Sequence, residues 1–510
     1  MKGNRMRLVA WMLLTVMVLG LMPVLGASAQ TSTKDTLIMG VDREPVSLDP
    51  ADVLTNVKQM IENGIYDTLL TFDADMTIQP RLAESWEKVD ELTWKFNLRQ
   101  GVKFHNGDEL KASDVLFSFR RAGESAVAAR AVMMFDLAAS EAPDDYTFIL
   151  KTKEPYAYTE AQLCDRMLSV LSEAAVSAMG QDHARNPVGT GPYVFGSWVA
   201  GDNITIHRND NYWGEKSILK TLVFRIITES ASRTIDLESG GLDLTLALPQ
   251  NDAERIAANP DMQLLVHTYN AVRYIGFNCA QPKLQDKRVR QALNYATDTK
   301  TIRAVVYGEN TSGEMLSPVP AELPGFNPDL VQYEYNVDKA KALLKEAGVE
   351  NLELEFMYLA NSANNMLAAM LQQMWGEVGV TLVLKPTESG ALSTALNKGE
   401  HEICSAGTTN ALGEAGAGLY NFFNTKTQFT SGNRTNLSVP EIDALLDKIQ
   451  VTTDTAEREK MVYDAQVLIH EEAPMIYLSY QYAILGASAK LKGLTLTPTS
   501  MYDFTKVYFE

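Results

Sequence analysis

The sequence predicts an α/β protein with at least two lobes, and three observations carry this prediction. The chain has 510 residues, which is more than one hydrophobic core usually supports. Strand-like and helix-like patterns alternate along its length. After about residue 270 the alternation becomes a clear βαβ unit, which requires parallel strands and a right-handed crossover.

Strand-like segments dominate the first half of the chain. DTLIMGV, DNITIHRN and TLVFRIIT are examples, and the segment 92–99 (LTWKFNLR) places apolar residues at every second position. Asn106–Gly107 is a strong hairpin signal because both turn positions favour positive φ. We therefore expect a strand–turn–strand from Lys103 to Leu110, followed by a helix from Asp114 to Arg121.

The βαβ unit lies in the second half of the chain. The segment 352–359 (LELEFMYL) predicts a strand, 363–379 a helix ending at Gly379, and 380–387 the next strand. A short helix then leads to a strand at 401–407.

Two further helices carry capping signals. Asn336 is the expected N-cap of a helix that stops at Gly348, and Ser438 with Glu441 predicts a capping box. These features carry no functional information.

The N-terminal segment 1–29 is predicted to be a secretory signal peptide. Lys2, Arg5 and Arg7 precede an apolar stretch, and Ala27-Ser28-Ala29 forms a small-x-small cleavage site. No cysteine stands at the cut, which disfavours a lipid anchor. The alternative is a retained membrane anchor. We expect an exported protein, periplasmic or at the cell surface.

The charge and the cysteine content argue against certain binding partners and against a disulfide-rich fold. The formal charge is −19, and removing the three positive charges of 1–29 takes it to −22. Such a charge disfavours nucleic acid or an anionic membrane as partner. Cys164, Cys279 and Cys404 are odd in number and widely spaced, so we expect buried free thiols rather than a disulfide framework.

The sequence offers no convincing catalytic or metal motif. His105 and Asp108 could form a pair, but no nucleophile lies nearby in sequence. The glycines of 186–193 (NPVGTGPY) precede a strand instead of a helix, so we interpret them as turn-forming. HEEAP at 470–474 lacks the second histidine of a zincin. We expect no enzyme activity, no cofactor and no metal.

The segment 405–420 (SAGTTNALGEAGAGLY) raises a different question. It is too rich in glycine for a favourable helix, and its single charge is Glu414. Lys and Arg are missing from 399–425, so a phosphate is not the expected ligand. A carboxylate among glycines suits a cation such as an ammonium group. The alternative is an exposed acidic loop tip.

Several motifs, taken together and in order, resemble the extracellular solute-binding proteins of the peptide/nickel (family 5) class, which serve ABC importers. The resemblance covers nearly the whole mature chain. It is carried by PVSLDPA (45–51), LRQGVKFHNGDELKASDVLFSFRRA (98–122), NPVGTGPYVFGSWVAGDNITIHRNDNYW (186–213), YIGFNCAQPKLQDKRVRQALNYATD (274–298), YNVDKAKALLKEAGV (335–349) and APMIYLSYQ (473–481).

The resemblance implies a two-lobe periplasmic binding protein fold (class II type) that closes on its ligand by a hinge motion. An extra subdomain is expected in the first lobe, and the hinge is expected near Val266–Thr268 and Ser479–Tyr482. The implied boundaries are 30–268 and 481–510 for lobe I, about 56–195 for its extra subdomain, and 269–480 for lobe II.

The resemblance also implies candidate ligand contacts. In peptide-binding members an aspartate of a Gly-Asp-Ala-like loop pairs with the peptide ammonium, and the matching positions here are Gly413-Glu414-Ala415. Glutamate replaces that aspartate. The implied polar neighbours are Thr408, Thr409 and Asn410.

A second anchor is expected for the ligand carboxylate. Many dipeptide-binding members use an arginine just before the helix that begins near Met366, where this chain has Asn364 and Asn365. Arg434 is a candidate substitute, and Asn365 a further candidate contact.

The implied function is capture of a peptide-like solute and its delivery to an ABC permease by a monomeric protein. Alternative ligands are a metal chelate, an oligosaccharide or an opine-like conjugate. A secreted hydrolase is the remote alternative, and it would need a nucleophile–base pair.

Overall fold

The computed structural model describes residues 34–52, 55–410, 412–429, 432–499 and 501–510. The predicted signal peptide, 1–29, lies outside the described residues. None of the helices in the described part of the chain is long and apolar enough to cross a membrane.

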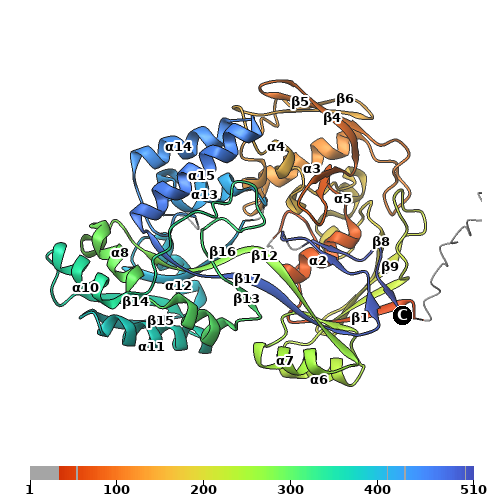
Figure 1. Cartoon of the computed structure of the whole chain (residues 1–510). Helices are drawn as coiled ribbons and strands as arrows, with labels where there is room; N and C mark the ends of the chain where they lie inside the picture. Colours follow the sequence, from red (N-terminus) through yellow and green to blue (C-terminus); the bar gives the residue numbers. More distant parts are fainter. Residues whose placement is uncertain (1–33, 53–54, 411, 430–431, 500) are drawn as a thin grey trace, which may run out of the picture.

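One mixed sheet of eleven strands runs through the whole molecule (Figure 1). Its strands follow in the order β15 (Thr381–Thr387), β14 (Glu353–Leu359), β16 (Ile403–Thr409), β12 (Met262–Phe277), β17 (Met475–Ser488), β11 (Leu244–Thr245), β1 (Thr36–Val41), β10 (Thr221–Ile226), β9 (Asn203–Arg208) and β8 (Tyr193–Val199), with β13 (Ser312–Gly313) paired to β17. The strands around β1 belong to the first lobe and those around β14 to the second. The α/β fold with two lobes is confirmed.

The long strands β12 and β17 connect the lobes and pair with each other in antiparallel register. The pairing runs from Met262 opposite Ser488 to Gly276 opposite Met475, and a bulge interrupts it between Thr268 and Val272. In Figure 1 both strands pass through the centre of the molecule. The predicted hinge segments fall inside these two strands.

The core of the first lobe joins segments from both ends of the chain. Buried residues of β1 and β10 share one cluster with Phe504 and Phe509 from the C-terminal segment. The helix α2 (Asn56–Ile65) buries Met60 and Ile61 in the same cluster.

A separate antiparallel sheet marks the additional part of the first lobe. Its order is β4 (Ala83–Asp90), β5 (Thr93–Leu98), β7 (Thr147–Lys151) and β6 (Glu141–Asp144), and α3 (Ala112–Glu124) contacts it. The period-two apolar pattern predicted β5, and α3 covers the predicted helix. Phe96, Phe119 and Phe148 meet in its buried core.

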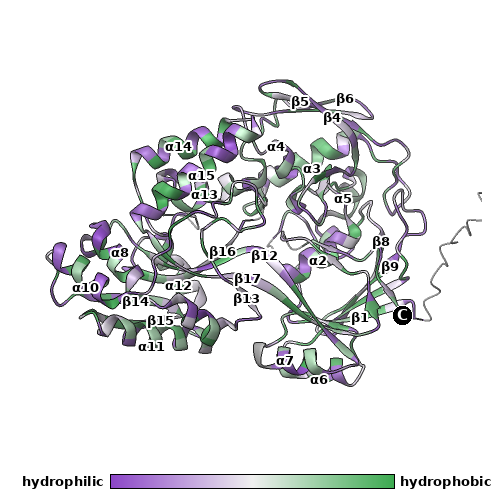
Figure 2. Ribbon diagram, viewed as in Figure 1, coloured by the Kyte–Doolittle hydropathy of each residue, from purple (hydrophilic) through white to green (hydrophobic). Residues whose placement is uncertain are grey.

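The second lobe contains the predicted βαβ unit. β14 and β15 pair in parallel, and α11 (Ser362–Gly376) connects them. The helices α8 (Lys287–Tyr295), α10 (Val337–Glu346) and α12 (Ser389–Asn397) also belong to this lobe. In Figure 2 the outer helix α10 alternates between hydrophilic and hydrophobic colours, as expected for a helix with one buried face.

The structure confirms one predicted cap and corrects another. Asn336 accepts a hydrogen bond from the Lys339 N–H and caps α10, and Gly348 has φ of +70°. The capping box at Ser438 is absent from the described residues. Instead α14 (Pro440–Val451) starts at proline after Val439, because proline tolerates the first helical turn.

The glycine-rich segment 405–420 was expected to be unfavourable for a helix, but part of it forms one. α13 (Ala415–Phe423) contains Gly416 and Gly418 and packs against α14 and α15 (Thr455–Glu472). A Cβ on Gly416 would collide with the Tyr158 hydroxyl and lie 2.5 Å from Ile449 Cγ2. Close packing therefore outweighs the low helix propensity of glycine.

The remaining elements are short or peripheral. They are β2 (Leu70–Phe72), β3 (Ile78–Pro80), α4 (Thr159–Gln162), α5 (Glu173–Met179), α6 (Ser230–Glu238), α7 (Gln250–Ala258), α9 (Thr299–Ile302), β18 (Leu491–Lys492), β19 (Thr495–Leu496), β20 (Tyr502–Asp503) and β21 (Tyr508–Phe509). The three cysteines are free, and Cys164 and Cys404 are buried.

Candidate functional site

A cavity of about 1040 Å³ lies between the two lobes. Thr55, Gln59 and Arg166 line it from the first lobe, and Tyr269 and Ala271 of β12 form part of its wall at the crossing strands. The second lobe contributes the end of β16, one side of α13 and the turn around residue 434, through Thr409, Asn410, Ala417, Gly418, Tyr420, Asn421 and Arg434 among others.

The structure brings three of the predicted site residues to this cavity. Thr409 and Asn410 lie at the carboxyl end of β16, and Arg434 lies in the turn that follows α13. The Asn410 amide donates to the Glu414 carbonyl at 2.7 Å, so part of its hydrogen-bonding capacity is used within the protein. Thr408 pairs through its backbone with Val272, and its side chain lies outside the described part.

Three other predicted residues do not line the cavity. Gly413 has φ of +65°, and a Cβ there would collide with Met76 of the first lobe. Asn365 is exposed on α11. Glu414 precedes α13 as its N-cap residue, but its side chain makes no capping bond. Their roles as ligand contacts stay predictions.

Glu414 faces a packed contact between the lobes. The Tyr156 and Tyr158 rings meet edge to face there at 5.7 Å, and the Arg458 guanidinium lies 5.6 Å from the Tyr158 ring centre. The Ala157 N–H donates to the Gln450 carbonyl at 2.8 Å, which connects the first lobe to α14. Burial raises the pKa of the Glu414 carboxyl to about 7.

A side pocket of about 710 Å³ adjoins the interlobe cavity, and Arg434 and Gln481 line both. It opens beyond the carboxyl ends of β14 and β15, where Leu359, Asn361 and Ser389 lie. Open α/β sheets place their ligands at this end of parallel strands. The two spaces therefore border each other at Arg434 and Gln481.

Sequence reasoning missed Arg273, which lines the side pocket together with Arg434. Arg273 lies on β12 opposite Ser479, and its Nη1 is 3.5 Å from the Ser479 Oγ. Its guanidinium lies 4.8 Å from the centre of the Tyr307 ring. Burial lowers the pKa of Arg273. A charged residue inside the apolar segment AVRYIGF was the signal that could have identified it.

The backbone of Arg434 is held in place by buried polar groups. The His401 ring is 2.8 Å from the Arg434 carbonyl through Nε2, and the buried Asn433 amide donates to the Leu437 carbonyl at 2.9 Å. The Arg434 Nε is buried and has no hydrogen-bond partner among the described residues. The turn therefore presents a guanidinium whose charge no described carboxylate compensates by an ion pair.

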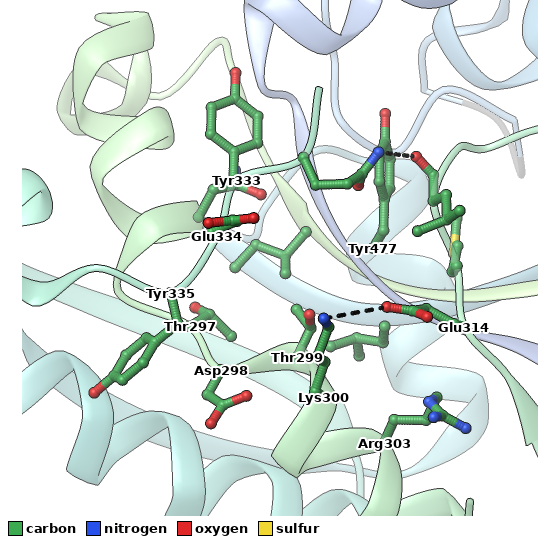
Figure 3. Close-up of a pocket in the computed structure, with 16 residues that line it drawn as sticks. Thr297, Asp298, Thr299, Lys300, Arg303, Glu314, Tyr333, Glu334, Tyr335 and Tyr477 are labelled. Atoms are coloured by element: carbon green, nitrogen blue, oxygen red, sulfur yellow. Dashed lines mark hydrogen bonds and ion pairs between the residues drawn. The ribbon is translucent and has the colours of Figure 1, made fainter. Parts of the chain in front are cut away.

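A third cavity, of about 530 Å³, lies within the second lobe and differs in its charges (Figure 3). It shares no lining residue with the interlobe cavity. Lys300 lies 4.0 Å from Glu314, and the cavity is also lined by Asp298 and Glu334. Carboxylates accompany its cations, Lys300 and Arg303, so its lining is of mixed charge, unlike that of the side pocket.

The segment around His105 and the 186–193 loop, which both carry the family resemblance, contact each other through structural hydrogen bonds. The His105 ring contacts the 186–193 loop through Nε2 and the Gly191 carbonyl, 3.0 Å apart, and it accepts from the Gly189 N–H at 3.3 Å. Gly189 and Gly191 are not turn glycines with positive φ, which corrects the interpretation from sequence. Their backbones lie against Ile65, where a Cβ would not fit.

Comparison with known families decides the classification. The sequence pattern of bacterial extracellular solute-binding proteins, family 5, matches residues 77–430. This chain belongs to that family. As a family 5 protein it is 29% identical to heme-binding protein A of Haemophilus influenzae, over 92% of this chain and 91% of the relative. It is 28% identical to the dipeptide-binding protein of Escherichia coli, over 88% and 89% of the two chains.

Solved structures agree with the family 5 fold. The periplasmic binding protein DppA from Helicobacter pylori, in complex with the peptide STSA, matches with a TM-score of 0.80 and 29% identity over 94% of this chain and 99% of the other. HbpA2 from Haemophilus parasuis matches with a TM-score of 0.85 and 27% identity, over 93% and 100% of the two chains.

Proposed function

We propose that this protein is the substrate-binding component of an ABC importer and that it captures a peptide-like solute between its lobes. The observation that carries the proposal is the cavity of about 1040 Å³ between the lobes, which shares Arg434 and Gln481 with a side pocket at the carboxyl ends of β14 and β15. Ligand pockets of roughly 300–1,000 Å³ bury most of a small solute, so this space suits a short peptide.

The lining suits a peptide backbone. Hydroxyl and amide groups such as Thr409, Asn410 and Gln481 alternate with the aromatic rings of Tyr156, Tyr269 and Tyr420. Polar groups of this kind can hydrogen-bond main-chain amides without selecting each side chain. Peptides, glutathione and heme are named as ligands among the relatives.

Capture requires a domain motion, for which we propose the predicted boundaries. Lobe I comprises 30–268 and 481–510, lobe II comprises 269–480, and the paired strands β12 and β17 bend where they cross between them. A ligand shifts the equilibrium to the closed form only if it binds that form more tightly. Contacts to both lobes provide this difference in affinity.

Delivery to the permease follows from closure. The signal peptide predicted at 1–29 directs export to the periplasm or the cell surface, and the permease then recognises the closed form. We propose no chemical step, since the role requires only binding and release. The protein acts as a monomer.

The proposal is tested by identifying the natural ligand and measuring how much it stabilises the protein. Native mass spectrometry of the exported protein should reveal a bound compound, and denaturation should release a peptide-like molecule. In thermal unfolding, a peptide at 100 times its Kd should add about 2.7 kcal/mol to the free energy of unfolding. Stabilisation by heme, a sugar or an opine, with none by any peptide of two to nine residues, would contradict the peptide assignment.

A further inference from the structure

The side pocket is cationic in a strongly anionic protein. Two of its lining residues are arginines, Arg273 and Arg434, and no carboxylate is among the described residues that line it. The chain as a whole carries a formal charge of −19. The lining of this compartment is therefore opposite in sign to the chain as a whole.

Neither arginine has an ion-pair partner in the described part of the chain. Arg273 contacts only neutral groups, the Ser479 hydroxyl and the Tyr307 ring, and the Arg434 Nε is buried without a partner. Two lysines at the main cavity are compensated, Lys426 by Asp447 at 2.9 Å and Lys448 by Glu457 at 3.0 Å. The side chains of Arg273 and Arg434 are half-buried, and a partly desolvated cation without an ion pair favours an anion supplied from outside the chain.

Two helices add to the positive potential. The cavity is lined by Asn361, Ser362 and Ala363 at the N-terminus of α11 and by Ser389 at the N-terminus of α12. Helix N-termini present free N–H groups and a partial positive charge, which favour anions. They act here in support of the two arginines.

We propose that the side pocket binds a dicarboxylate end group of the solute, such as the C-terminal aspartate or glutamate of a short peptide. This inference rests on the proposed function and specifies its ligand class. Arg434 lines both compartments, so it is placed to hold the α-carboxylate at the junction. Arg273, which lines only the side pocket, then holds the side-chain carboxylate.

Two separate carboxylates fit this geometry better than one compact dianion. The guanidinium groups come from different elements, β12 and the turn at 432–436, and the pocket has a volume of about 710 Å³. An arginine fork matches one carboxylate in a bidentate manner. Each arginine can therefore take one carboxylate.

The test compares matched peptides by isothermal titration calorimetry. Ala-Ala-Glu and Ala-Ala-Gln differ only in one end-group charge, and Ala-Ala-Asp, glutarate and inorganic phosphate complete the set. We expect the glutamate peptide to bind about tenfold or more tightly than the glutamine peptide, the size of effect of one charge-assisted hydrogen bond. Higher salt should reduce the difference.

Substitutions of the two arginines distinguish their proposed roles. Arg273→Gln should remove the preference for glutamate while leaving the affinity for Ala-Ala-Gln within about threefold of the wild-type value, and Arg434→Gln should weaken both peptides about tenfold or more. Arg120→Gln is the matched control, because Arg120 is exposed and lines neither compartment. It should leave the preference unchanged. Circular dichroism of each ligand-free variant checks its folding.

Each outcome decides the inference. Equal affinity for the glutamate and glutamine peptides, or a preference that survives Arg273→Gln, would overturn it while the peptide-binding function stands. If no peptide binds but glutarate binds in an Arg273-dependent manner, the inference stands and the peptide assignment falls. Binding of phosphate alone, or of no acidic member of the set, overturns the dicarboxylate assignment.

Discussion

The interlobe contact around Glu414 and the side pocket around Arg434 differ in how closely the protein packs around a charged side chain. Each contains an ionisable side chain without an ion pair among the described residues, and each was a candidate ligand contact by sequence. Glu414 faces Tyr156 and Tyr158 in a packed contact, whereas Arg434 borders open space of ligand size. The comparison shows that two charges without ion pairs can have different surroundings, a packed contact for Glu414 and a cavity for Arg434.

The largest expected effect comes from disturbing the packed contact at Gly416. In Gly416→Ala the new methyl group would collide with the Tyr158 hydroxyl and Ile449, and overpacking of this kind costs about 1–3 kcal/mol. Because the contact connects the lobes, we expect ligand affinity to fall by about tenfold or more. Calorimetry with the natural cargo measures the affinity, and small-angle scattering measures closure.

Gly376→Ala in α11 is the matched control. Gly376 has open space where a Cβ would be added, so this variant gains helix propensity, about 1 kcal/mol, without a collision. If both variants bind equally well, the close approach at Gly416 does not matter for closure.

The next effect concerns the charge of Glu414 and depends on pH. The folded-state pKa is raised from 4.5 to about 7, so ionisation costs stability, and the cost grows as pH rises from 4.5 to 7. Glu414→Gln should therefore raise the free energy of unfolding at pH 8 by roughly 1–3 kcal/mol and change it little at pH 4.5.

Thermal unfolding of both proteins at the two pH values checks this prediction. The neighbouring groups that could alter the titration are Tyr156, Tyr158, Glu160, Cys164, Arg458 and Glu459. If Glu414 also pairs with a ligand ammonium, Glu414→Gln would in addition weaken amine-bearing peptides about tenfold, which the packed contact alone does not predict. The two roles thus predict different measurements.

A smaller effect is expected for Arg434 in the ligand-free protein. Removing an uncompensated cation that serves the ligand should not destabilise the fold, so Arg434→Gln should leave the free energy of unfolding of the ligand-free protein unchanged or raise it. Chemical denaturation without ligand measures it. A loss of 3 kcal/mol or more would indicate a structural role for the guanidinium.

The smallest effect is expected for a charge that is both paired and exposed. Lys460 and Asp464 form an ion pair of 2.6 Å one turn apart on α15, with most of the lysine side chain exposed. Asp464→Asn should cost no more than about 0.5 kcal/mol. A larger cost in denaturation would mean that surface charge in general, not burial, explains the contrast between Glu414 and Arg434.

Much of the fold could be predicted from the sequence because its signals are local. The alternation in 352–359 and 380–387 gave the strands β14 and β15, and Asn336 and Gly348 gave the limits of α10. The helix α13 could not be predicted, since the benefit of its glycines lies in contacts with Tyr158 and Ile449, far away in sequence.

The site was harder to predict for the same reason. The family resemblance suggested Thr409, Asn410 and Arg434, and these residues line the cavity, whereas the direction of Glu414 depends on how the two lobes pack. Arg273 was missed because its strand was interpreted as structural. An arginine in a strand that crosses between lobes is a signal that a sequence reader can use.

The boundary between the two compartments has a consequence for how this protein could be modified. Among the described residues, Arg434 and Gln481 alone line both spaces. Substitutions confined to the side-pocket wall, at Ser393 or Thr311 for example, would alter which terminal group is accepted without touching the groups that hold the rest of the solute. If the proposed division of the site holds, selectivity and affinity could diverge independently, and biosensors with a chosen terminal specificity could be engineered from this scaffold.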